Sequence, residues 1–137
     1  MAAYNKFNQF IEDLSHGVHN LGSDQLTVAL CAAANAPVAT NSVLADLTEI
    51  SYTNCSSRDI TTTTSEGSDG TYELVLQDLT LTASGGAIAT FRYIVVYNNT
   101  PTSPADPLIA WFDYGSNLDL ADTETLLIDM QATFLTL

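Results

Sequence analysis

The densest apolar run of the chain is Phe91-Arg92-Tyr93-Ile94-Val95-Val96-Tyr97-Asn98-Asn99. The turn residues Ser84-Gly85-Gly86 precede it, and Pro107-Leu108-Ile109-Ala110-Trp111-Phe112-Asp113-Tyr114 follows it. Apolar side chains at successive positions are typical of a central strand covered on both faces. We therefore expect strands over 88–97 and 108–114, joined by an exposed loop over 98–107.

Alternation of apolar and polar residues predicts the other strands. Residues 25–31 alternate as expected for a strand with one buried face. Residues 72–83 also alternate, but the parity changes at Gln77-Asp78, which predicts a β-bulge or a sharp bend. We expect an edge strand over 59–64 and a last strand over 125–135. A turn is expected at Gly115-Ser116-Asn117.

The N-terminal segment predicts one amphipathic helix over 4–20. Its apolar positions recur at spacings of three and four: Tyr4, Phe7, Ile11, Leu14, Val18 and Leu21. Gly17 weakens the last turn, and Gly22 is the expected stop. With no repeat or linker, the prediction for residues 1–137 is mainly β. We expect a single-domain antiparallel β-sandwich of seven or eight strands with this one helix.

Composition narrows the possible partners. The 137 residues carry a net charge of −13, with 16 acidic residues against three cations. This balance argues against nucleic-acid binding and against anionic membrane surfaces. No signal-peptide pattern or apolar run of membrane length is present, so we expect synthesis in the cytoplasm of the producing cell.

Two sets of side chains have the residue types of a metal site. Glu12, His16 and His19 share one face of the expected helix, without a fourth ligand or a known spacing. Asp119, Asp122 and Glu124 form an acidic loop that lacks the ligand spacing of a calcium site. A solvated helix face and turn capping are the favoured interpretations, so the prediction is no metal and no cofactor.

Catalytic chemistry has little support in the sequence. No Gly-x-Ser-x-Gly elbow is present, and neither cysteine has a neighbouring histidine. Cys31 is expected to be a small buried hydrophobe, and Cys55 lies in a polar loop. A bridge between the two cysteines is the less favoured alternative. Arg92, embedded in a central strand, is expected to pair with Asp113 or Asp78.

Aromatic residues gather in the expected strands over 88–97 and 108–114. They are Tyr93, Tyr97, Trp111, Phe112 and Tyr114. Core and cross-strand packing is the favoured interpretation for this group, with Trp111 and Tyr97 the members expected to reach a surface.

Several blocks together resemble a known class of protein. They are Lys6-Phe7-Asn8-Gln9-Phe10-Ile11-Glu12-Asp13-Leu14, residues 20–30, residues 41–50, residues 82–93 and Trp111-Phe112-Asp113-Tyr114-Gly115-Ser116. This pattern covers nearly the whole chain and resembles small virion proteins of tailed bacteriophages and prophages. The resemblance implies a non-enzymatic structural component, in particular a cement or decoration protein on the outer capsid lattice. Its partners would be the major capsid protein and copies of itself, often as a trimer, and its location the capsid surface.

Three elements are the expected contacts: the N-terminal helix, the 98–107 loop and the C-terminal tail. The candidate interface residues are Tyr4, Phe7, Ile11, Asn98, Thr100, Pro101, Pro104, Phe134, Leu135 and Leu137. Deleting 134–137 is expected to weaken assembly and leave the sheet folded. The alternatives are a phage tail or head–tail connector component, or a fibre-like carbohydrate-binding module that exposes Trp111 and tyrosines. An enzyme is the least supported class.

Overall fold

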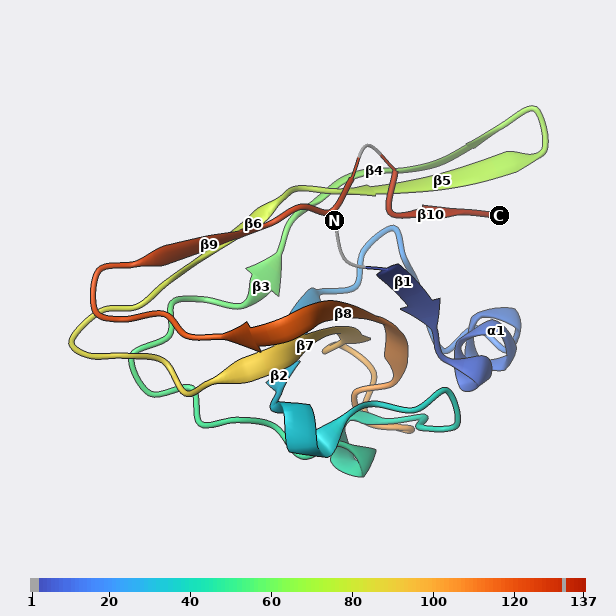
Figure 1. Ribbon diagram of the computed structural model, residues 1–137. Helices are drawn as coiled ribbons and strands as arrows, with labels where there is room; N and C mark the ends of the chain where they lie inside the picture. Colours follow the sequence, from blue (N-terminus) through green and yellow to red (C-terminus); the bar gives the residue numbers. More distant parts are fainter. Residues whose placement is uncertain (1–2, 132) are drawn as a thin grey trace.

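The computed structural model describes residues 3–131 and 133–137. Figure 1 shows two layers of antiparallel strands. One layer is a five-stranded sheet in the order β1 (Ala3–Lys6), β8 (Leu108–Leu118), β7 (Phe91–Asn98), β2 (Leu26–Cys31) and β3 (Asp59–Ile60). The other layer contains the sheet β10 (Leu135–Thr136), β5 (Thr71–Leu76), β4 (Thr62–Ser68) and the ribbon β6 (Leu79–Thr82), β9 (Thr125–Ile128). The predicted mainly β, sandwich-like fold is confirmed, although the described residues form ten strands.

The core has two parts, one on each face of the five-stranded sheet. The main cluster lies between the layers and includes Val28, Leu74, Leu81 and Ile94. The second cluster includes Ala29, Cys31, Tyr93 and Val95, and Leu44 and Leu47 pack against it. Strands β2 and β7 are therefore covered on both faces, as predicted for 88–97. For 25–31 the prediction of one buried face is wrong, because the 3-10 segment η2 (Leu44–Asp46) and its neighbours cover the second face.

The N-terminal prediction of one helix over 4–20 is wrong at both ends. Residues 3–6 form β1, which pairs with β8, and the helix α1 spans only Asn8–Ser15. Gly17 adopts a φ of +78° directly after the helix, a conformation that glycine accepts without strain and that ends the helix. The buried helical residues are Phe10 and Asp13, whereas Ile11 points to solvent. The apolar positions that predicted a helix over 4–20 therefore belong to a strand, a helix and a turn.

At two other places the chain passes from one sheet to another. The bend expected at Gln77-Asp78 is confirmed, and there the chain leaves β5 for the β6–β9 ribbon. The predicted strand over 59–64 divides at Thr61, because β3 borders β2 while β4 pairs with β5 in the other layer. Both β3 and β4 lie at sheet edges, as that prediction required.

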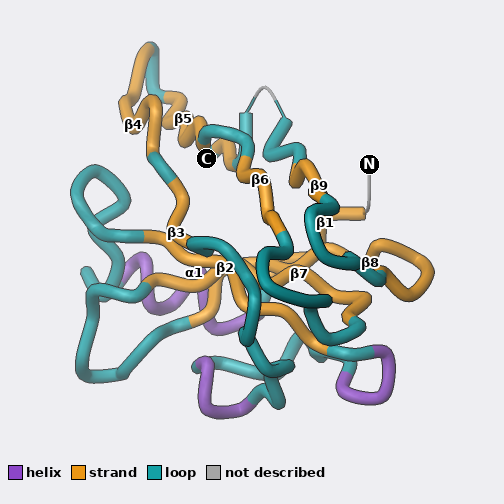
Figure 2. Tube along the Cα trace, turned by 90° about the vertical axis from the view of Figure 1, so that its left-hand side faces the viewer, coloured by secondary structure: helices purple, strands orange, loops and turns teal. Residues whose placement is uncertain are grey.

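Strand β8 continues beyond the expected turn at 115–117. Tyr93 pairs with Asp113 and Phe91 pairs with Leu118, so residues 114–117 lie opposite Arg92 alone. The extra residues form a bulge that Gly115 permits with a φ of +92°. Figure 2 shows this part of β8 extending away from the sheet.

The predicted last strand over 125–135 is interrupted. Ile128 pairs with Leu79 in the ribbon, whereas Leu135 pairs with Leu74 in the three-stranded sheet. Between them the Met130 amide donates to the Asp78 carboxylate at 2.8 Å, and Gln131 has a φ of +63°. The alternation of apolar residues could not locate the point at which the chain passes from the ribbon to the three-stranded sheet. Ile128 before that point and Phe134 after it are both buried, so the apolar pattern continues across it. Ala132, part of the predicted alternation, lies outside the described residues.

The outer edge of β2 is closed by the chain itself. Strand β3 covers only Leu26 and Thr27, and the loop before β3 continues the cover. The Tyr52 hydroxyl accepts a hydrogen bond from the Leu30 amide at 2.9 Å. Arg58 lies 3.6 Å from the Tyr52 ring centroid and donates to the Val28 carbonyl at 2.6 Å. The polar groups of this edge are thereby satisfied.

Candidate functional site

The structure divides the ten candidate interface residues by burial. The side chains of Phe7, Asn98, Phe134 and Leu135 are buried within the domain. Pro101 is half-buried, and the exposed members are Tyr4, Ile11, Thr100, Pro104 and Leu137. The buried residues contact their own fold, so their assignment as contact residues is corrected. The sequence showed that they are apolar or lie in a loop, but not what covers them.

Asn98 illustrates the correction for the 98–107 loop. Its side-chain amide donates to the Asp24 carboxylate at 2.7 Å and to His19 Nδ1 at 3.0 Å. Its side-chain oxygen accepts from the Thr100 amide at 3.1 Å. Asn98 thus ties the start of the loop to the segment after α1.

An apolar cleft of about 240 Å³ opens between β8 and β9. Ile94, Phe112, Tyr114, Leu126, Leu127, Ile128 and Asp129 line it. The Tyr4 ring lies 5.8 Å from the Phe112 ring and extends this surface to β1. We call Tyr4 and the six apolar lining residues the open-side seam, because here no backbone pairing connects β8 with β9. Leu127 is 60% exposed and Tyr114 is 47% exposed.

Sequence reasoning missed Tyr114 and Leu127 as surface candidates. Leu127 occupies an outward position in β9, between Thr125 and Asp129, so an apolar side chain at that parity was the available signal. For Tyr114 no such signal existed, because its exposure follows from the β8 bulge. The other aromatics behave differently: Tyr93, Tyr97 and Phe112 are buried, which confirms core packing but not the expected exposure of Tyr97. Trp111 is half-buried, with its ring 4.5 Å from Phe7.

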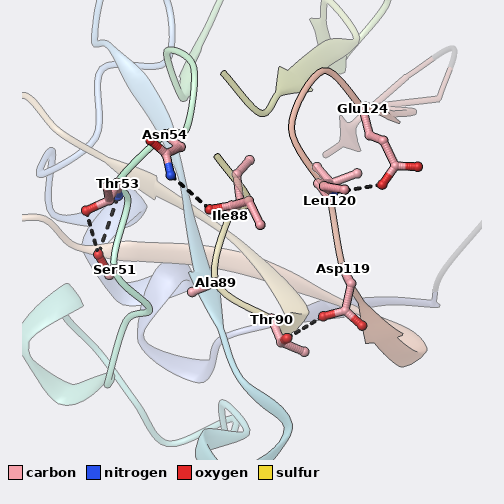
Figure 3. A pocket seen from close by; sticks show the side chains of 11 residues that line it. Ser51, Thr53, Asn54, Ile88, Ala89, Thr90, Asp119, Leu120 and Glu124 are labelled. Carbon is pink, nitrogen blue, oxygen red and sulfur yellow. Dashed lines mark hydrogen bonds between the residues drawn. The ribbon is translucent and has the colours of Figure 1, made fainter. Parts of the chain in front are cut away.

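A second hollow, of about 530 Å³ and with both polar and apolar side chains in its lining, lies on another part of the surface (Figure 3). Asn54 donates to the Ala87 carbonyl at 3.1 Å, and Thr90 donates to the Asp119 carboxylate. Glu124 accepts from the Ala121 amide at 2.7 Å, and Asp122 accepts from Gly85 at 3.0 Å. The acidic loop therefore caps turns and neighbouring segments, as its favoured interpretation held.

The two candidate metal sets do not come together as sites. The Glu12 carboxylate lies 3.9 Å from His16 Nδ1, but His19 is buried and directs Nδ1 to Asn98. Within residues 3–131 and 133–137, no group of three His, Cys, Asp or Glu side chains is placed to hold a metal ion. The Glu12, His16 and His19 set fails because the chain leaves the helix at Gly17.

Both cysteines are free thiols. Burial raises the pKa of Cys31 to about 11, and Glu49 adds to that rise. Burial also raises the pKa of Cys55, while the charge of Arg58 acts in the opposite direction. A raised pKa leaves little thiolate at neutral pH, and the thiolate is the reactive form.

Arg92 pairs with Asp113, one of the two partners expected. The guanidinium binds both carboxylate oxygens, at 2.9 and 3.1 Å. Asp113 also accepts from the Gly115 amide at 2.8 Å, which ties the β8 bulge to this pair. These hydrogen bonds, with that from Arg92 the largest, lower the pKa of Asp113.

Comparisons with known proteins give this chain no relative. No protein-family model, curated protein or solved structure matches it. No helix in the described part of the chain is long and apolar enough to cross a membrane. What the protein does must therefore be inferred from its own residues, and the exposed Tyr114 and Leu127 make the open-side seam a departure from an ordinary polar surface.

Proposed function

We propose that this chain is a non-enzymatic structural protein of a phage virion, acting as a cement or decoration protein on the outer capsid lattice. The observation that carries the proposal is the open-side seam, where Tyr114 and Leu127 expose apolar area beside unjoined strand edges. Contiguous exposed apolar area marks contact sites in soluble proteins. The resemblance of the sequence to small virion proteins suggests that this contact is made within a virion.

The net charge of the chain indicates the charge that a partner surface should carry. With a net charge of −13 and three cations, two copies of this protein repel each other at long range. A capsid lattice with basic or neutral polar sites facing outward would attract it. Each subunit would bury the seam against the lattice, and many copies per particle would add the effect of multivalent attachment.

Counting copies in purified particles tests the proposal. We expect quantitative mass spectrometry of gradient-purified particles to find the chain in heads at hundreds of copies. A few to a few dozen copies would instead indicate a tail or connector component. Absence from every particle fraction would overturn the virion role.

The seam itself is tested with matched variants. Tyr114→Ser should lower the occupancy of particles at least tenfold, because it removes exposed apolar area from the proposed contact. Val38→Ser is the control, since Val38 is 52% exposed but lies outside the seam. Equal occupancy for both variants would show that attachment uses another surface.

The carbohydrate-binding alternative requires aromatic side chains together on an exposed concave surface. Tyr93 and Tyr97 are buried, and Trp111 packs against Phe7. Their positions favour the core over a sugar-binding platform.

A further inference from the structure

Strand β9 has one edge that the described residues leave open. Leu79, Leu81 and their neighbours in β6 pair with one side of β9. The outer edge of β6 is covered at Thr82, since Ser56 donates its amide to the Thr82 carbonyl at 3.1 Å and its side-chain oxygen accepts from the Thr82 amide at 2.9 Å. No strand pairs with the outer side of β9 in residues 3–131 and 133–137. The open edge contrasts with β2, whose outer edge Tyr52 and Arg58 close.

The register shows which groups face outward. The Ala83 amide donates to the Glu124 carbonyl at 3.0 Å and continues the pairs Leu81–Leu126 and Leu79–Ile128. Because hydrogen-bonded pairs alternate in an antiparallel ladder, the backbone groups of Thr125 and Leu127 point away from β6. The backbone N–H and C=O groups of these two residues are therefore placed to pair with a further strand along the outer edge of β9.

Natural sheet edges are commonly protected by lysine, proline or a covering segment. Residues 125–128 read Thr-Leu-Leu-Ile, without charge or proline. The most exposed side chain is Leu127, and the apolar cleft lies beside the strand. Such an edge accepts an added strand, with pockets for alternate side chains.

The charges at the two ends of β9 favour one kind of occupant. Glu124 precedes the strand and Asp129 follows it, and both are exposed. Neither forms an ion pair among the described residues. They are five positions apart, which corresponds to about 16 Å along an extended chain. A second copy of this chain is a poor occupant, because its three cations face 16 acids.

We propose that the outer edge of β9 binds an extended, cation-flanked segment of a partner protein as an added β-strand. The segment pairs with the outward backbone groups of Thr125 and Leu127 and inserts apolar side chains into the cleft between β8 and β9. Its Lys or Arg residues lie near Glu124 and Asp129. The inference rests on the proposed assembly role and identifies the chemistry of the segment that the seam receives.

The test uses the full chain and a blocked hexapeptide, acetyl-Lys-Val-Thr-Val-Thr-Lys-amide. We expect the peptide to bind the protein with a dissociation constant on the order of a millimolar, which an NMR titration measures. Hydrogen exchange at the Thr125 and Leu127 amides should slow at least threefold at saturation. The Leu126 and Ile128 amides, already paired with β6, should change less. This alternating pattern distinguishes strand addition from nonspecific contact.

Matched controls separate charge from edge pairing. The peptide with Glu in place of both Lys residues should bind at least tenfold more weakly. Leu127→Lys should weaken binding of the cationic peptide at least tenfold, whereas Val38→Lys adds the same charge elsewhere and should retain it within about twofold.

Three results would overturn the inference: equal binding of both peptides, no slowing at Thr125 and Leu127, or slowing there at high protein concentration without peptide. The last would identify a second copy as the occupant. Each leaves the copy-number test of the virion role intact, because particles can be counted whichever edge is used.

Discussion

At the scale of single residues, His19 depends on neighbours from distant parts of the chain. The Asn98 side-chain oxygen accepts from Thr100, so its nitrogen is the atom that donates to His19 Nδ1. The neutral ring must then carry its proton on Nε2. In the described residues that buried atom has no hydrogen-bond partner. Nothing in the sequence around His19 indicates this arrangement.

The pKa of His19 gives a prediction at this scale. Burial lowers it below 6.5, while the charges of Asp13 and Asp24 partly oppose the change. The folded state therefore binds this proton less readily than the unfolded chain. The His19 contribution to the free energy of unfolding is constant above pH 6.5 and declines as the pH falls through the lowered pKa.

NMR titration of the His19 ring measures that value. Asp24→Asn should lower the pKa further, because it removes one of the charges that favour the protonated ring. A midpoint above 6.5, or an upward movement in Asp24→Asn, would contradict this account.

At the scale of elements, the C-terminal strand is part of the domain. Leu135 pairs with Leu74, and the Leu137 amide donates to the Tyr72 carbonyl at 3.0 Å. The Phe134 ring lies 5.6 Å from that of Tyr4, which joins the two layers. Deleting 134–137 is therefore expected to destabilise the fold, which replaces the expectation drawn from sequence.

Two single substitutions test the role of β10. Phe134→Ala should lower the free energy of unfolding by about 3–5 kcal/mol, as typical for a buried aromatic side chain. Leu137→Ala should change it by about 0.5 kcal/mol or less, since this side chain is half exposed. Urea unfolding measures both, and similar losses for the two variants would count against this division.

At the scale of the whole molecule, charge opposes compactness. A net charge of −13 on one domain produces mutual repulsion that added salt screens. We expect the thermal midpoint to rise when NaCl increases from about 20 to 200 mM, a range over which the Debye length falls severalfold. Differential scanning calorimetry measures it, and a midpoint that falls with salt would refute the importance of this repulsion.

The sequence by itself determined the β class, a buried central strand within 88–97, the break at Gln77-Asp78 and the pairing of a central arginine with a carboxylate. These features depend on side-chain period and on charge, which are local. Only the tertiary structure decided that Phe134 is core, that residues 114–117 bulge outward and that β9 keeps an open edge. Burial and edge exposure depend on which distant segment lies alongside, and the period of one strand carries no information about its neighbour.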